Sequence, residues 1–210
     1  MSRPLEKVTN AKMVSFGIGS AIFLLVLHQS EPGFMFGVDM ANLLFHEAGH
    51  PLVGSISATM ETYGGTIGQL AIPALLAFAF WRKRQTVALA ATMIWFFENF
   101  LNIARYVADA RAQELPLVGG GDHDWNRILS RWNALDQDTA IGGWLRTTGW
   151  IGMTAAVAWV CWRWWHDRRN RLADDALQQL WAANVERTHS TDESVSSPEG
   201  LPMRPRSTPL

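Results

Sequence analysis

The chain has 210 residues, of which 48% are hydrophobic and 18% are charged, and its 18 basic and 19 acidic residues give a net charge of −1. This balance excludes a protein that binds nucleic acid through bulk positive charge, and it argues against a polyacidic tail protein. The single cysteine, Cys161, excludes an internal disulfide framework and any zinc or iron–sulfur site built on several cysteines.

The charges are concentrated in a few parts of the chain. No lysine or arginine occurs between Lys12 and Arg82, and residues 85–104 carry a single charged residue, Glu98. Soluble domains spread charge along the chain because their exposed turns need it. We therefore predict an all-α fold, a multi-span transmembrane helical bundle of four to five spans. The 11 tryptophans support this prediction, since indole rings favour the headgroup boundary.

Four apolar segments have the length of a membrane-spanning helix: residues 13–27, 66–81, 86–106 and 141–165. Such helices can cross roughly 30 Å of hydrocarbon with little or moderate tilt. No small-residue cleavage site follows the first segment, so we interpret it as a retained anchor and not as a secretory signal.

A further segment, residues 34–60, is apolar but contains several polar side chains. If it enters the membrane and returns, the protein has four spans and a cytoplasmic N-terminus, and if it crosses, there are five. We prefer four, because five would place the basic N-terminal residues outside, against the positive-inside rule. The same rule places the basic clusters at 82–84 and 168–171 in the cytoplasm. We therefore expect loop 109–140 to be extracytoplasmic and the C-terminal tail to be cytoplasmic.

Three parts of the chain differ in composition. Residues 1–165 form the predicted transmembrane bundle that holds the metal site. Residues 166–187 space their apolar side chains as in an amphipathic helix that lies in the cytoplasm on the membrane or on the bundle. Residues 188–210 are rich in serine, threonine and proline, and we expect them to be disordered.

The pentapeptide His46-Glu47-Ala48-Gly49-His50 is the sharpest chemical signal in the sequence. Two histidines four residues apart lie about 40° apart around a helix and one turn apart along it, so both imidazoles can reach one metal ion. Glu47 projects beside that metal, where it can act as a general base towards water. Ionisable side chains in hydrocarbon are costly unless paired or bound, which favours binding of Zn²⁺ by His46 and His50 over a structural polar seam.

A catalytic zinc site needs a third protein ligand besides the two histidines. The best source is the segment Asp122-His123-Asp124, which follows three glycines that allow the backbone to turn inward. We predict His123 as the third metal ligand, with Asp124 or Asp122 as the alternative ligand or as a carboxylate that orients an imidazole. The competing interpretation is a solvated acidic turn.

A second polar stripe, made of Glu98, Asn102, Arg105 and Asp109, has helical spacing. The structural interpretation is an ion-pair ladder in which Arg105 pairs with Glu98 or with Asp109. The functional interpretation is that Glu98 or Asn102 lines the metal cavity, while Arg105 polarises a substrate carbonyl or stabilises an oxyanion.

Three glycines, Gly64, Gly65 and Gly68, follow the motif segment closely. They favour either an unwound segment, at which a substrate backbone can approach, or close packing between helices. The sequence leaves both alternatives open.

The motif in a membrane helix, followed by a glycine-rich stretch and further spans, resembles the site-2 type of intramembrane zinc metalloproteases. The run from Phe45 through Asp109-Ala110-Arg111 and His123-Asp124-Trp125 is similar to a group of small bacterial membrane proteins that share the HEAGH motif. The resemblance covers roughly residues 34–145. It implies that the two histidines of the motif bind zinc, that its glutamate is the general base, and that the protein is a multi-pass protein of a bacterial inner membrane.

Together these features predict a membrane-embedded, zinc-dependent, metalloprotease-like hydrolase that cleaves peptide bonds within or near the membrane. Its expected partners are membrane lipid and a transmembrane peptide substrate, with no nucleic acid. The alternative is an accessory or assembly subunit of a larger membrane complex, whose metal is structural and does not require Glu47. A metal hydrolase that acts on a lipid or a small molecule is a third possibility, which the sequence does not separate from the first.

Overall fold

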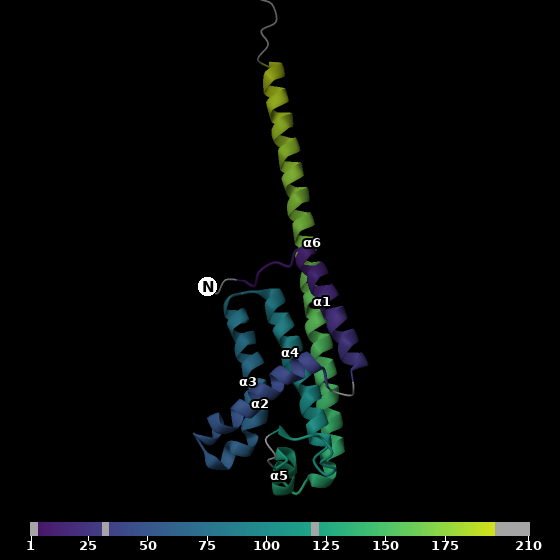
Figure 1. The fold of residues 1–210 in the computed structure, drawn as a ribbon. Helices are drawn as coiled ribbons and strands as arrows, with labels where there is room; N and C mark the ends of the chain where they lie inside the picture. The colour runs from purple at the N-terminus through teal and green to yellow at the C-terminus, as the bar shows by residue number, and fades with distance from the viewer. Residues whose placement is uncertain (1–3, 31–33, 119–121, 196–210) are drawn as a thin grey trace, which may run out of the picture. The chain divides into compact units, whose positions relative to one another are not determined.

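The computed structural model describes residues 4–30, 34–118 and 122–195, with residues 188–195 described by their backbone alone. Within these ranges the regular secondary structure is helical and no strand occurs, which confirms the predicted all-α fold (Figure 1). The helices are α1 (Asn10–Gln29), α2 (Phe36–Gly54), η1 (Ala58–Met60), α3 (Glu61–Arg82), α4 (Thr86–Ala108), α5 (Asp124–Arg131), η3 (Leu135–Gln137) and α6 (Asp138–Val195). The chain divides into two compact units, Met1–Asp167 and Arg168–Leu210.

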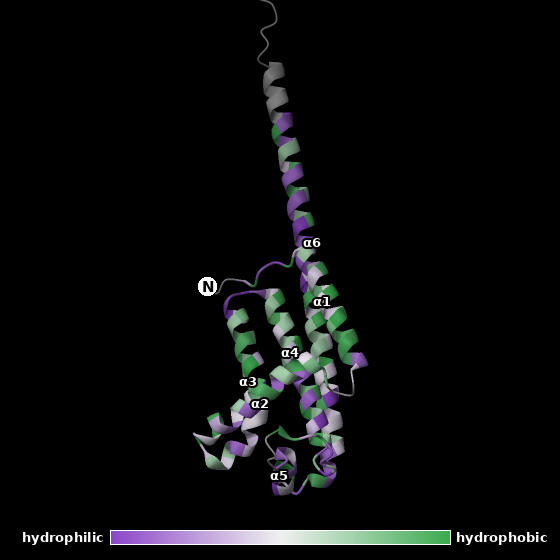
Figure 2. Cartoon of the chain, in the orientation of Figure 1, coloured by the Kyte–Doolittle hydropathy of each residue, from purple (hydrophilic) through white to green (hydrophobic). Residues whose placement is uncertain are grey.

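Three helical stretches of the described residues are long and apolar enough to cross a membrane: Asn10–Gln29, Ala58–Arg82 and Thr86–Ala108. Figure 2 shows the hydrophobic colour along much of α1 and α3. These stretches correspond to three of the four predicted spans. The fourth, residues 141–165, lies within α6 and is not among the three, because its tryptophans, its glycines and Arg146 lower its mean hydropathy. The chain therefore has the helices of a membrane protein, while the number of spans stays a prediction.

A hydrophobic core joins α1, α4 and α6 in the first unit. Its buried members include Phe16, Leu27, Ala90, Ile94, Leu101, Met153 and Val160. Helix α6 approaches α4 closely at Gly149 and Gly152, where an added Cβ would overlap the side chains of Leu101 and Phe97. Figure 1 shows α1 lying beside α6. These three helices form the scaffold against which the polar elements are placed.

The N-terminal segment, the α3–α4 turn and the stretch of α6 at Asp167 meet at one end of the first unit. The backbone N–H of Glu6 donates to the carbonyl oxygen of Arg84 at 2.9 Å, and Thr86 Oγ1 donates to the carbonyl oxygen of Glu6 at 2.7 Å. The backbone N–H of Val8 donates to Asp167 Oδ2 at 2.8 Å. This end, the basic end, therefore collects the basic residues of the N-terminal segment and of the α3–α4 turn.

Helix α2 crosses α3 at a contact made by glycines. A Cβ added to Gly49 would overlap the carbonyl oxygen of Gly64, and one added to Gly68 would overlap the carbonyl oxygen of Phe45. Helix α3 continues unbroken through its glycines. Of the two alternatives that the sequence left open, the structure shows close packing between helices and no unwound segment at these positions.

The second unit begins at Arg168 and, in its described part, consists of the C-terminal portion of α6. Four large apolar side chains of the predicted amphipathic segment are exposed: Leu172, Leu177, Leu180 and Trp181. The helix includes residues 188–195, and residues 196–210 of the predicted disordered tail lie outside the described residues. Contact of this segment with a membrane stays a prediction.

Candidate metal centre

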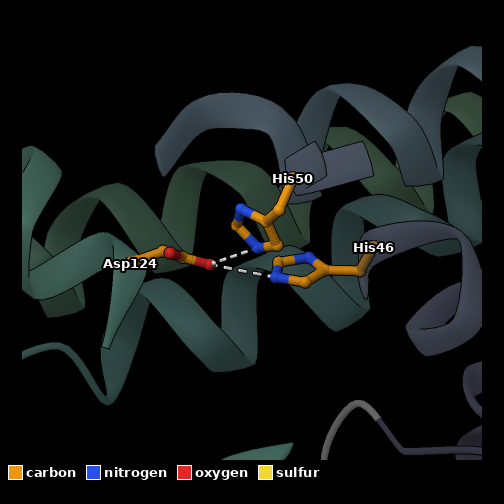
Figure 3. A group of neighbouring side chains, drawn as sticks. All are labelled: His46, His50 and Asp124. Atoms are coloured by element: carbon orange, nitrogen blue, oxygen red, sulfur yellow. Dashed lines mark hydrogen bonds and ion pairs between the residues drawn. The ribbon is translucent and has the colours of Figure 1, made fainter. Parts of the chain in front are cut away.

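His46 and His50 lie one turn apart in the second half of α2, and Asp124 is the first residue of α5. Nε2 of His46 is 3.0 Å from Asp124 Oδ2, and Nε2 of His50 is 3.1 Å from the same oxygen. Figure 3 shows the two imidazoles converging on that carboxylate oxygen. One potential ligand atom from each residue lies within 4.8 Å of the other two, so the three side chains form a group that could hold a metal ion.

The second ring nitrogen of each histidine contacts an oxygen atom. His46 Nδ1 is 2.9 Å from Gln69 Oε1, and His50 Nδ1 is 2.9 Å from the backbone carbonyl oxygen of Glu61. Because these oxygens only accept, each Nδ1 carries a hydrogen and donates it, and in the neutral imidazole this leaves an Nε2 lone pair directed at Asp124. Two lone pairs and a carboxylate oxygen so close together favour a cation among them, and this donor set suits zinc as well as iron or manganese.

Tyr106 and the first turn of α5 position Asp124. The backbone N–H of Asp124 donates to Tyr106 Oη at 3.1 Å. His123 caps the N-terminus of α5, where its Nδ1 accepts the backbone N–H of Asn126 at 3.2 Å. A carboxylate in the first turn of a helix is favoured by the positive end of the helix dipole. Asp124, the alternative third ligand predicted from the sequence, therefore belongs to the group.

His123 lies outside the group, although the sequence favoured it as the third ligand. Its buried ring packs on Tyr106 with 4.2 Å between the ring centroids, and its Nε2 is 3.4 Å from Asp109 Oδ2. Burial lowers the pKa of the His123 imidazole, which favours its neutral form. Asp122 is exposed and pairs with an arginine of α5. The glycines expected to turn the backbone inward, residues 119–121, lie outside the described residues.

A chain of carboxamide side chains, here called the amide chain, connects His46 to a buried carboxylate. Gln69 Nε2 donates to Asn102 Oδ1 at 3.4 Å, and Asn102 Nδ2 donates to Asp39 Oδ1 at 2.8 Å. Because a carboxylate only accepts hydrogen bonds, the NH₂ group of Asn102 must face Asp39. The side-chain oxygen of Asn102 then faces Gln69 and accepts a hydrogen bond from its NH₂ group. The oxygen of Gln69 is then left to accept from His46, so the amide chain fixes the Nδ1 hydrogen of His46, a potential metal ligand.

The ion-pair ladder expected on α4 is not formed among the described residues. Glu98 accepts a hydrogen bond from Asn42 Nδ2 at 2.9 Å, so the polar stripes of α2 and α4 face each other. Asp109 accepts two backbone N–H groups from the segment that follows α4. Arg105 instead places its guanidinium over an aromatic ring and lines a cavity together with Asn102. Asn102 therefore lines a cavity that His46 also lines, as the functional interpretation expected of Glu98 or Asn102, while the expected action of Arg105 on a substrate carbonyl or an oxyanion stays a prediction.

Glu47 lies where two hollows meet. The first, the polar hollow, is lined by the three members of the metal group and by charged side chains that include Glu61, Asp122, Arg127 and Arg131. The second, here called the apolar cavity after its apolar patch, has a volume of about 280 Å³. Phe34, Leu43 and residues 115–118 supply the apolar patch, and polar side chains of α2, α3 and α4, among them Asp39 and Asn102, supply the rest of the lining. His46, Glu47 and Tyr106 line both. Glu47 is exposed and makes no hydrogen bond or ion pair with the described residues, so its carboxylate is accessible to a molecule in either hollow.

Two supporting residues, Gln69 and Tyr106, were not identified from the sequence, and Gly65 was identified there only as a site of helix packing or of substrate approach. Gly65 makes room for the ligand, since a Cβ there would overlap the imidazole of His46. Gln69 carried a usable signal, because it is the only carboxamide in the apolar segment 66–81. Tyr106 carried none, since a tyrosine at the end of an apolar segment is ordinary at a membrane boundary.

The chain matches no protein-family model, no curated protein and no solved structure. The resemblance to site-2 metalloproteases and to the HEAGH membrane proteins therefore stays an expectation.

Proposed function

We propose that the protein is a membrane-embedded, zinc-dependent hydrolase of the metallopeptidase type that cleaves peptide bonds within or near the membrane. The observation that carries the proposal is Glu47, which lines the same open hollow as the three potential metal ligands. Three protein ligands with a free position are typical of catalytic zinc, whereas structural zinc is enclosed by four. Among the described residues, the group contains three.

In the proposed reaction each side chain has a separate task. A metal ion held by the group supplies positive charge that acidifies water and polarises a carbonyl. Glu47 takes a proton from the attacking water and delivers it to the leaving nitrogen. Tyr106 accepts the N–H of Asp124, so its own hydroxyl hydrogen is left to donate to a substrate oxygen as negative charge develops there.

We further propose that the metal centre lies at the extracytoplasmic end of the bundle. It contacts the first turn of α3 through Glu61 and the last turn of α4 through Tyr106. Residues 82–84 lie at the opposite ends of both helices, at the basic end. The positive-inside rule assigns the basic end to the cytoplasm, and with it the C-terminal tail that follows Asp167.

The test combines metal content with turnover. We expect about one zinc per chain in detergent-purified protein, measured by plasma mass spectrometry, and its loss in His50→Ala and Asp124→Asn. Glu47→Gln keeps the zinc and loses cleavage of a synthetic peptide mixture followed by mass spectrometry, since the base is removed and the ligands remain. Cleavage retained by Glu47→Gln, or full zinc content in both ligand variants, contradicts the proposal.

One observation favours the alternative of an accessory subunit with a structural metal. The exposed fractions of Leu172, Leu177, Leu180 and Trp181 are 59%, 66%, 64% and 72%, which offers an apolar contact surface to a larger membrane complex. In that case Glu47→Gln changes neither metal content nor assembly, while loss of the metal ligands changes both.

A further inference from the structure

The apolar cavity lies directly beside the catalytic residues of the proposed hydrolase. Its apolar lining consists of Phe34, Leu43, Leu115, Pro116, Leu117 and Val118. At about 280 Å³ its volume is near the lower limit of small-molecule sites, which begin at roughly 300 Å³. A site of this size fits an apolar group of about one amino-acid residue and is too small for the two acyl chains of a lipid.

Among the described residues that line the apolar cavity, Arg105 is the only arginine or lysine. It lies in the last turn of α4, is half-buried, and no carboxylate of the described residues is within ion-pair distance of it. Its guanidinium lies over the ring of Phe34, with 5.2 Å from Cζ to the ring centroid. Stacking of this kind holds a guanidinium in place and leaves its N–H groups free to donate. An ionisable side chain in a membrane helix is costly unless it is paired or functional. Two carboxylates, Asp39 and Glu47, also line the cavity, but neither is in an ion pair with Arg105, and Asp39 accepts hydrogen bonds from asparagine side chains. The guanidinium is therefore available to an anion that enters the cavity.

The positions of Arg105 and Glu47 indicate how far the anionic group of a substrate lies from the bond that is cleaved. Both side chains line the apolar cavity, whereas Arg105 does not line the polar hollow. The anionic group of the substrate therefore lies in the apolar cavity, on the side of the cleaved bond that faces away from the polar hollow. The small volume of the cavity places it about one residue from that bond. In a peptide, an apolar side chain and an anionic group occur together within one residue at the C-terminal residue.

We propose that the apolar cavity binds the C-terminal residue of a peptide, with its apolar side chain against Leu43 and Phe34 and its terminal carboxylate on Arg105. The inference rests on the proposed function and narrows it to a carboxypeptidase. A planar carboxylate accepts two parallel N–H groups from a guanidinium, which fixes the orientation of the residue. The preceding residues of the peptide then lie in the polar hollow.

The reaction balances as an ordinary hydrolysis. Water forms the new C–O bond at the last peptide carbonyl, and the C–N bond to the C-terminal residue breaks. Glu47 carries the proton from the water to the leaving nitrogen. The products are a peptide shortened by one residue and a free apolar amino acid, and no oxidant, reductant or further reactant is needed.

Binding is tested first, on protein treated with a chelator, so that a metal cannot hold the carboxylate. The probes are N-acetyl-leucine and N-acetyl-leucinamide, which differ only in the anionic group, and calorimetry compares their affinities. We expect about 10- to 100-fold tighter binding of the carboxylate, the range of a charge-assisted hydrogen bond, and loss of that preference in Arg105→Gln. Arg146→Gln, which changes an exposed arginine of α6, is the matched control and keeps the preference. Equal binding of the two probes, or binding of dodecanoate with no binding of N-acetyl-leucine, overturns the inference.

Cleavage is tested second, with the zinc-loaded protein and two peptides that end in the same leucine as a free carboxylate or as an amide. We expect release of leucine from the free peptide and about 10- to 100-fold less cleavage of the amide, with the difference removed in Arg105→Gln. Equal cleavage of both peptides overturns the role of Arg105 and leaves the proposed hydrolase standing. Cleavage of neither peptide, nor of the peptide mixture, overturns the hydrolase and the inference together.

Discussion

Gly65 leaves the space that the imidazole of His46 occupies, because a Cβ at this position would overlap the ring. The ring is the far end of a flexible side chain, so it can turn aside, but it then leaves the ligand position. We expect Gly65→Ala to lower zinc affinity by about 10- to 100-fold, the range found when groups that orient a ligand are changed. Competition with a chelator measures the affinity, and circular dichroism checks that the helical content is unchanged.

Gly143→Ala is the matched control for this substitution, since nothing lies within 4 Å of a Cβ at that position. Both changes add one methyl group to a helix and favour the helix by up to about 1 kcal/mol. Equal zinc affinity in the two variants would show that the space at Gly65 does not determine where His46 lies.

Gln69 tests whether the amide chain matters for the metal. In Gln69→Leu the Nδ1–H of His46 loses its acceptor, so we expect zinc affinity to fall by about 10- to 100-fold. Gln69→Glu keeps an acceptor oxygen and should retain more of the affinity than the leucine variant. If Gln69→Leu and Gln69→Glu have the same zinc affinity in a chelator competition, the side chain of Gln69 does not act as the acceptor for His46.

Single residues show which parts of the site could be predicted. The spacing of His46 and His50 is a local property of one helix, so the sequence alone predicted that both imidazoles reach the same potential metal ion. The sequence also indicated Asp124 as a candidate third ligand. His123 and Asp124 are neighbours, and the choice between them depends on the cap of α5 and on Asp109, which no spacing reveals. Gln69 stands out in the sequence as the only carboxamide of residues 66–81, but its contact with His46 depends on how α2 and α3 pack.

At the scale of helices, the contact between α2 and α3 depends on Gly64. A Cβ there would lie 2.6 Å from the carbonyl oxygen of Gly49 and 2.8 Å from Cα of His50. Backbone atoms cannot rotate aside, so the two helices must separate. We expect Gly64→Ala to destabilise the fold by about 1–3 kcal/mol, the usual cost of overpacking, and to lower zinc affinity as well. Thermal unfolding with and without chelator separates the two effects, and Gly37→Ala, with open space around its Cβ, is the control.

The segment between α4 and α6 is fastened by Arg111 and Asp138. The backbone N–H and Nε of Arg111 both donate to the carboxylate of Asp138, and these bonds lower the pKa of Asp138 from its ordinary value of 3.8. A lowered pKa stabilises the fold above the ordinary value, and the stabilisation is lost as the pH falls through the lowered pKa. We therefore expect Asp138→Asn to reduce the melting temperature of the metal-free protein at pH 7, and the difference from the unchanged protein to shrink below about pH 4. A difference that is constant over this range contradicts the role of the carboxylate charge.

The ends of a helix were predictable from the sequence where the helix is apolar throughout, and less so where it combines an apolar stretch with a charged one. The apolar runs that became α1, α3 and α4 are nearly free of charge, and the sequence located them within a few residues. Helix α6 joins an apolar stretch to a charged one, so the change in composition at residue 166 does not mark a helix end. The stripes of α2 and α4 were visible in the sequence, but the bond from Asn42 to Glu98 depends on how the helices pack.

For the whole molecule, the four-span and five-span topologies differ in where the N-terminal segment lies. Four spans place it in the cytoplasm, and five place it outside. The bond from Glu6 to Arg84 places this segment at the α3–α4 turn, and the bond from Val8 to Asp167 places it beside α6. With the N-terminus and the α3–α4 turn on one side, the chain crosses an even number of times between them. We therefore expect that α2 does not cross, as the four-span prediction requires.

This topology predicts which residues a membrane-impermeant maleimide reaches in intact cells. In a Cys161→Ala background, single cysteines replace Pro4, Gln85 and Gln137, all exposed and uncharged. We expect labelling at 137 without permeabilisation, and labelling at 4 and 85 only after it. Five spans instead expose 4 together with 137 and leave only 85 protected. Because position 85 is protected under both topologies, the reactivity of position 4 decides between them, and its labelling in intact cells would contradict the contact between Glu6 and Arg84 as well.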